Sequence, residues 1–305
     1  MANLLAADKQ RIALQMLVEG NSLRSVTRLT GVHRTTVMNL LVRFGDGCRQ
    51  FMDEEMRGLT LNHVEVDEIW TFVAKKRARL HVEDRDDPMI GDMYLWVPLD
   101  QETKLVPTFA IGKRSADMAR RLMVDLAARL EMPRPQDWWN TAFDKVVQIS
   151  TDGFKAYPEA VDLAFGPYCK YGTIIKDFRN VDRPPGNYSP GQIISVERKA
   201  RFGMSEDEMD TICTSHVERQ NLTIRTFMKR FARLSLGFSK KLENLAAASA
   251  LHFAYYNFCW RPRYQDWSGQ PGRLRPTPAM MAGVTGQLWS FGDLFSEVSA
   301  RYLKS

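Results

Sequence analysis

The chain has 305 residues, 44% of them hydrophobic and 26% charged, which is the composition of a globular protein with room for about two domains. Its four cysteines form no CxxC pair, it has no uncharged apolar run of about 18 residues, and from the pattern of its first residues no signal peptide is expected. A zinc ribbon, a disulfide framework and a membrane partner are therefore not expected, the predicted location is the cytoplasm at the nucleoid, and the net charge of +6 favours polyanionic partners.

Residues 1–56 are predicted to form a small all-α domain. Apolar residues at helical spacing predict helices at 9–19, 23–30 and 33–44, with Ser22 as a cap and Gly31 in the turn before the third helix. This is the helix-turn-helix arrangement, in which the second helix of the motif enters the major groove of DNA. A plain three-helix docking bundle is the alternative. The predicted DNA contacts on the third helix are Arg34, Thr35, Thr36, Asn39 and Arg43.

Residues 57–262 alternate between strand and helix patterns. Period-two apolar residues predict a strand at 63–73, and shorter strands are expected at 93–99, 105–111, 146–149 and 171–175. Helices are predicted from the Ser115 cap toward Pro133, at 216–234 and at 239–258. This order predicts an α/β domain whose mixed sheet is flanked by helices.

Three carboxylates in this region are candidates for catalysis. Asp67 lies in the middle of a predicted strand, where an acid is costly unless it is paired or binds a metal. Asp152 directly follows the predicted strand at 146–149 and could instead only cap a helix. Glu218 lies on a predicted helix and could be an ordinary surface acid. Three oxygen ligands of this kind suit hard divalent cations.

Basic residues continue along the helix that carries Glu218. Arg225, Lys229 and Arg230 are predicted to contact DNA phosphates, although such a run can also be a solvated face. Before this helix, residues at about 177–215 are predicted to be an insertion that clamps DNA or forms a solvated loop. After it, residues 263–305 are expected to be a Pro/Gly/Arg-rich extension ending in a short helix near 288–302.

Together these motifs show a resemblance to a known family. The segments VDEIW at 66–70, TDGFKAY at 151–157, HVERQNLTIR at 216–225 and RFARLSLGFSK at 230–240 occur in the order found in transposases of the insertion sequence one family. The chain resembles that family over about residues 61–260, with a compatible helix-turn-helix in front. It lacks the zinc-binding cysteine cluster that some relatives carry before the helix-turn-helix.

The resemblance implies a ribonuclease H-like catalytic core with a DDE triad of Asp67, Asp152 and Glu218. It further implies two Mg²⁺ ions, replaceable by Mn²⁺, and a homo-oligomer acting on double-stranded DNA at transposon ends and at the target. A ribonuclease H-like nuclease without strand transfer and a transposase-derived DNA-binding regulator are the alternatives.

Overall fold

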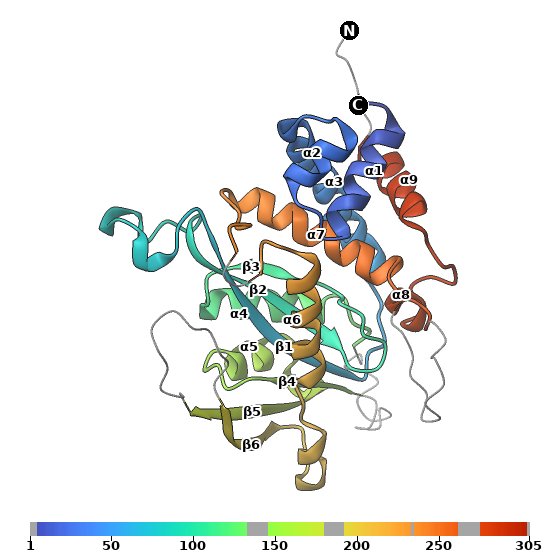
Figure 1. Ribbon diagram of the computed structural model, residues 1–305. Coiled ribbons are helices and arrows are strands. Elements are labelled where there is room, and N and C mark those ends of the chain that lie inside the picture. The colour runs from blue at the N-terminus through green and yellow to red at the C-terminus, as the bar shows by residue number, and fades with distance from the viewer. Residues whose placement is uncertain (1–4, 133–145, 180–191, 233–234, 262–274, 304–305) are drawn as a thin grey trace.

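The computed structural model describes residues 5–132, 146–179, 192–232, 235–261 and 275–303. Its centre is a six-stranded sheet with the strand order β3-β2-β1-β4-β5-β6 (Figure 1). β1 is parallel to β4 and β4 to β5, while the other neighbouring pairs are antiparallel. This mixed sheet flanked by helices is compatible with the predicted ribonuclease H-like fold. The strands are β1 (His63–Val73), β2 (Gly91–Asp100), β3 (Ala110–Gly112), β4 (Val147–Thr151), β5 (Cys169–Arg179) and β6 (Gln192–Phe202).

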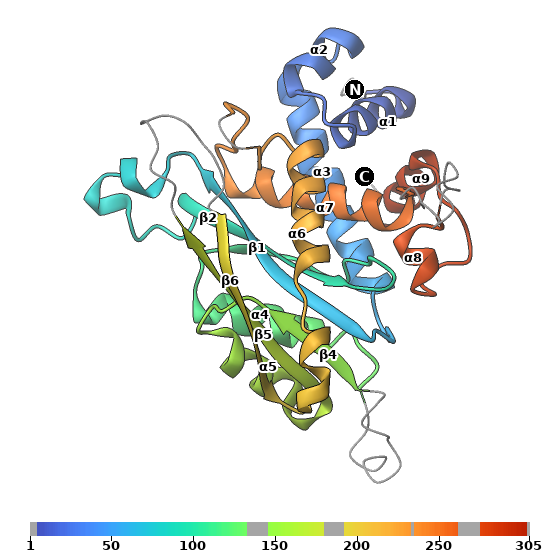
Figure 2. The same ribbon diagram turned by 60° about the horizontal axis from the view of Figure 1, so that its bottom comes forward.

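Helices cover both faces of this sheet. α4 (Ala116–Ala127) and α5 (Tyr157–Phe165) pack against each other on one face, and α6 (Ser215–Phe227) crosses β1 and β2 on the other (Figures 1 and 2). The Ser115 hydroxyl accepts a hydrogen bond from the Met118 amide at 3.3 Å, so the predicted cap of α4 is confirmed. Because β1 has helices on both sides, its two faces are both enclosed.

The N-terminal helices form where they were predicted, but the third is longer. α1 (Ala7–Val18) and α2 (Leu23–Thr30) are followed by Gly31 at φ +71°, and α3 (Arg34–Glu55) continues well past residue 44. Gly45 and Gly47 lie inside α3 and do not end it. At Gly45 the missing side chain lets the helix pack closely against its neighbour. A Cβ atom at Gly45 would lie 2.4 Å from the carbonyl oxygen of Ala247, so the backbones of α3 and α7 (Leu242–Phe258) are in contact.

The C-terminal helices complete this end of the molecule. α8 (Pro278–Met281) and α9 (Phe291–Tyr302) lie beside α7, and α9 also contacts α1 and α3 (Figure 2). A short helix near 288–302 was predicted, and α9 confirms it. One hydrophobic cluster runs from α1 through the sheet to α9. The helices in the described ranges are all too short or too polar to cross a membrane.

The predicted strand at 105–111 is wrong for most of its length, since β3 begins only at Ala110. A side chain from α7 takes the place of a neighbouring strand at this point. The Asn257 amide donates to the Val106 carbonyl at 2.8 Å and accepts from the Val106 amide at 3.1 Å. The buried backbone of Val106 is therefore satisfied without a sheet partner.

The stretch at about 177–215, predicted to be an insertion, contains a strand of the sheet, so it is not a solvated loop throughout. β6 pairs antiparallel with β5 and forms the edge of the sheet next to it. The Arg198–Arg201 stretch that was predicted as a clamp or loop lies on this strand. Residues 180–191 of this predicted insertion lie outside the described residues.

The predicted helix at 216–234 is also shorter than expected, because α6 ends at Phe227. The chain then turns toward the end of β1, where the Thr71 hydroxyl donates to the Arg230 carbonyl at 2.8 Å and Val73 bridges to Ser239. Lys229 and Arg230 therefore lie in the turn after α6 rather than on its face. Residues 233–234 lie outside the described residues.

Candidate functional site

Asp67 points from the middle of β1 toward α6. Its Oδ2 accepts a hydrogen bond from the Asn221 amide of α6 at 2.7 Å. Burial raises the pKa of Asp67 to about 6, and the negative charges of Asp152 and Glu218 act in the same direction. Both other members of the predicted triad thus lie close enough to Asp67 to affect its ionisation.

Asp152 reaches Asp67 through the parallel register of the sheet. Val66 of β1 is opposite Thr151, the last residue of β4, so Asp152 emerges beside Asp67. Its Oδ1 accepts from the Phe154 amide at 2.9 Å, and its Oδ2 contacts the Arg114 guanidinium at 2.9 Å. Asp152 therefore caps the turn after β4 and is also a member of the acidic group.

Glu68 is a member of this group that the sequence analysis missed. It follows Asp67 on β1 and turns to the opposite face of the sheet, where its side chain is 2% exposed and lies 3.5 Å from Arg114. One of its oxygens has no hydrogen-bond partner among the described residues. Burial, aided by the charge of Asp152, raises the pKa of Glu68 to about 7. Two consecutive acids in a strand with alternating apolar residues were the available signal.

Oxygen atoms of Asp67, Glu68 and Asp152, one from each, lie within 4.8 Å of one another. Burial is the main cause of the raised pKa values of Asp67 and Glu68, and repulsion from the neighbouring carboxylates adds to it. An unpartnered buried oxygen on Glu68 adds a free ligand atom. The donor set therefore fits a hard divalent cation such as Mg²⁺.

Glu218 lies beside this group rather than in it. It is in the first turn of α6, and its Oε1 accepts from the Thr214 hydroxyl at 2.8 Å and pairs with the Lys176 ammonium. Lys176 is also close enough to lower the pKa of Asp67. Lys176 and Arg114 thus place two cations around the carboxylates, and neither was predicted from the sequence.

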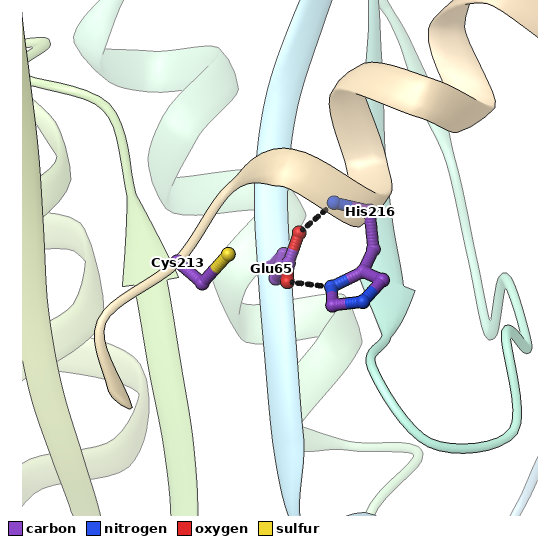
Figure 3. A group of neighbouring side chains, drawn as sticks. All are labelled: Glu65, Cys213 and His216. Carbon is purple, nitrogen blue, oxygen red and sulfur yellow. Dashed lines mark hydrogen bonds and ion pairs between the residues drawn. The ribbon is translucent and has the colours of Figure 1, made fainter. Parts of the chain in front are cut away.

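A buried glutamate holds the start of α6 in position. Glu65 is fully buried on β1, on the same face as Asp67, and its Oε2 accepts from the amides of His216 and Val217 at 2.9 and 3.0 Å. Its Oε1 contacts His216 Nδ1 at 2.6 Å (Figure 3). Since Glu218 follows two residues later, Glu65 fixes the end of α6 from which Glu218 projects.

Cys213 lies on the other side of Glu65, and the three side chains offer ligand atoms within 4.8 Å of one another (Figure 3). Both oxygens of Glu65 are already hydrogen-bonded, so this group is satisfied as a helix anchor without an ion.

The predicted DNA-contacting residues fall into two groups. Those on α3 are all exposed on one stretch of its surface: Arg34, Thr35, Thr36, Asn39 and Arg43. Those after Glu218 differ from one another. Arg225 is half-buried and close to Asp67, Lys229 is exposed, and Arg230 is held by a 2.7 Å hydrogen bond to the Ser239 hydroxyl. The Arg230 guanidinium thus has a partner within the protein, and its contact with DNA stays a prediction.

The carboxylate group predicts a stability difference that depends on pH. The folded-state pKa values of Asp67 and Glu68, about 6 and about 7, exceed the unfolded values of roughly 4, so ionisation destabilises the metal-free fold as the pH rises through this interval. Asp67→Asn should therefore melt above wild type at pH 8, and the gap should narrow at pH 5. Mg²⁺ at pH 8 should stabilise wild type more than the variant.

Thermal melting of the two proteins, with and without Mg²⁺, tests this expectation. Burial also lowers the pKa of His63 and of His252, which makes the folded state less stable as the pH falls. This contribution is the same in wild type and in Asp67→Asn, so the difference between the two melting temperatures isolates Asp67. A gap that is the same at both pH values would mean that Asp67 titrates normally.

Comparison with known proteins gives a weak likeness among solved structures. No family profile and no curated protein matches this chain. Among solved structures, it is similar to the one described as a pre-cleavage Mos1 transpososome, with a TM-score of 0.21 and 12% identity over 55% of this chain and 58% of that chain. A likeness of this strength supports neither a shared family nor a shared function. Membership of the insertion sequence one family therefore stays a prediction.

Proposed function

We propose that the protein is a DNA transposase that binds transposon ends and carries out metal-dependent DNA cleavage and strand transfer. The observation that carries the proposal is the convergence of Asp67, Glu68 and Asp152 oxygens within 4.8 Å of one another, with Glu218 alongside. Two strands and a helix that are far apart in the chain supply these acids, and a bound cation would offset the repulsion among their negative charges.

In this proposal Asp67, Asp152 and Glu218 form the catalytic set, and Glu68 is a fourth carboxylate beside them. Two Mg²⁺ ions, or Mn²⁺ in their place, would stabilise charge on the attacking and leaving oxygens of a phosphodiester. Arg114 and Lys176 stand at the edge of the group, where they can bind a DNA phosphate. Water is the first nucleophile and exposes a 3′-hydroxyl, which then attacks the target strand.

The partner in this proposal is double-stranded DNA. The exposed face of α3 presents Arg34, Asn39 and Arg43, of which the two arginines suit phosphates and Asn39 suits base edges. Two DNA segments, an end and a target, must be held at once for strand transfer. We therefore keep a homo-oligomer on DNA as part of the proposal.

A strand-transfer assay tests the proposal. Pre-cut duplexes taken from the DNA flanking the gene are incubated with the full chain, a plasmid target and Mg²⁺ or Mn²⁺. We expect molecules in which an end is joined to the plasmid. Nicked or degraded DNA without joined molecules would replace the proposal with a nuclease. Binding of the ends without any cutting would replace it with a DNA-binding regulator.

A further inference from the structure

A cavity lies between the N-terminal helices and the turn after α6. It has a volume of about 700 Å³ and is bounded by α1, the start of α2, α3, the segment that follows α6, and α7. Its apolar wall includes Leu17, Met38, Phe238 and Leu251. The volume falls within the roughly 300–1,000 Å³ typical of pockets for small organic molecules, so a nucleotide fits.

The charged residues that line this cavity are all cations: Arg24, Arg34, Lys229, Arg230 and Lys240. Arg24, Arg34, Lys229 and Lys240 are exposed, and within the described ranges they form no ion pair. Such a rim attracts phosphates, while the apolar wall behind it does not. The occupant that matches both parts is a nucleotide with its base inside and its flanking phosphates at the rim.

His252 provides the polar group for such a base once the side chains that cover its ring nitrogens move aside. It is 4% exposed on α7, lines the cavity, and neither of its ring nitrogens has a hydrogen-bond partner among the described residues. Burial lowers its pKa to about 4, so the ring is neutral and offers one donor and one acceptor. A buried, unpartnered side chain of this kind is costly unless a ligand or a water satisfies it.

Leu236 stands at the mouth of the cavity and is 96% exposed. An apolar side chain in this position can fill the gap that an extruded base leaves in the DNA stack, as apolar wedges do in other DNA-bending proteins. The cavity also lies at the far end of α6 from Glu218, at a distance of roughly 14 Å along the helix. That corresponds to about four base-pair steps of B-form DNA.

We propose that this cavity binds one unpaired or extruded DNA base, held by His252 inside and by phosphate contacts to Lys229 and Lys240 at the rim. The inference rests on the proposed function, since it places the base in the same DNA that the carboxylates would cut. It adds a site that distinguishes distorted DNA from an intact duplex.

The test compares binding of the full chain to two labelled duplexes that differ only in one unpaired adenine. We expect wild type to bind the bulged duplex at least about tenfold more tightly. His252→Leu removes both ring nitrogens, and Ala248→Leu narrows the cavity, so each should reduce this ratio to less than about threefold. Lys240→Ala should weaken binding of both duplexes by similar factors because phosphates are present in each.

The ratio within each variant controls for partial unfolding, which reduces binding of both duplexes alike. Equal binding of the two duplexes by wild type would overturn the base pocket and leave the proposed transposase intact. A tenfold preference that survives both His252→Leu and Ala248→Leu would also overturn it, leaving a water as the partner of His252. Binding of neither duplex at low salt would contradict the proposed function itself.

Discussion

Asp152→Asn should reduce Mg²⁺-dependent DNA cutting at least about 10³-fold, which corresponds to roughly 4 kcal/mol of transition-state stabilisation. The amide keeps the shape of the side chain and can still accept the hydrogen bond from the Phe154 amide. It removes the negative charge that a cation needs and the ionic contact with Arg114. Nicking of an end-containing plasmid measures the rate, and gel-shift titration measures DNA binding, which should change less than about twofold.

Asp162→Asn is the matched control, because Asp162 is an exposed residue of α5 and the substitution makes the same chemical change. It should cut DNA at the wild-type rate. Wild-type cutting by Asp152→Asn itself would remove Asp152 from the catalytic set and leave it as the cap of the turn after β4.

Glu65→Ala should lower the free energy of unfolding by about 3 kcal/mol, since it leaves two amides at the start of α6 without their buried acceptor. His216→Ala should cost only about 1 kcal/mol, because it removes a side chain that is partly exposed and leaves both amide contacts with Glu65 in place. Urea denaturation of the three proteins measures the difference.

The rate of DNA cutting by the same variants should show whether Glu65 also positions α6, apart from its effect on stability. At temperatures where Glu65→Ala remains folded, we expect its nicking rate to fall about 100-fold, since α6 no longer holds Glu218 in place. DNA binding through α3 should remain. Equal losses of stability in Glu65→Ala and His216→Ala, with normal cutting in both, would show that Glu65 does not position α6.

The sequence predicted local structure well where the signal is local. β1 has the predicted bounds at His63–Val73, and Ser22 and Ser115 cap their helices as predicted. These features depend on alternation along a strand or on a side chain bonding to a backbone amide three residues away. Asp67 and Asp152 were grouped from the sequence through the family resemblance, and the parallel register of β1 and β4 brings them side by side.

Other parts depend on contacts between distant residues, which periodicity does not encode. β6 looked like an insertion because both of its faces are exposed, so it lacks the apolar alternation of a half-buried strand. Glu65, Lys176 and Arg114 were missed because each acts through a partner on another element. The hydrogen bond from Arg230 to Ser239 could not be predicted for the same reason. The low helix propensity of Gly45 indicated the end of the third helix, whereas in the folded chain Gly45 is where α3 contacts α7.

The contact of Gly45 with the backbone of Ala247 affects the distance between the predicted DNA contacts on α3 and the carboxylates on the sheet. α3 is a 22-residue helix about 33 Å long, and at Gly45 it contacts α7. α7 is in turn hydrogen-bonded through Asn257 to Val106, beside the sheet. No flexible linker separates α3 from the described sheet along this route. If the proposed function is correct, the distance along the DNA from the contact at Arg34 to the cut at Asp67 is therefore set by the fold.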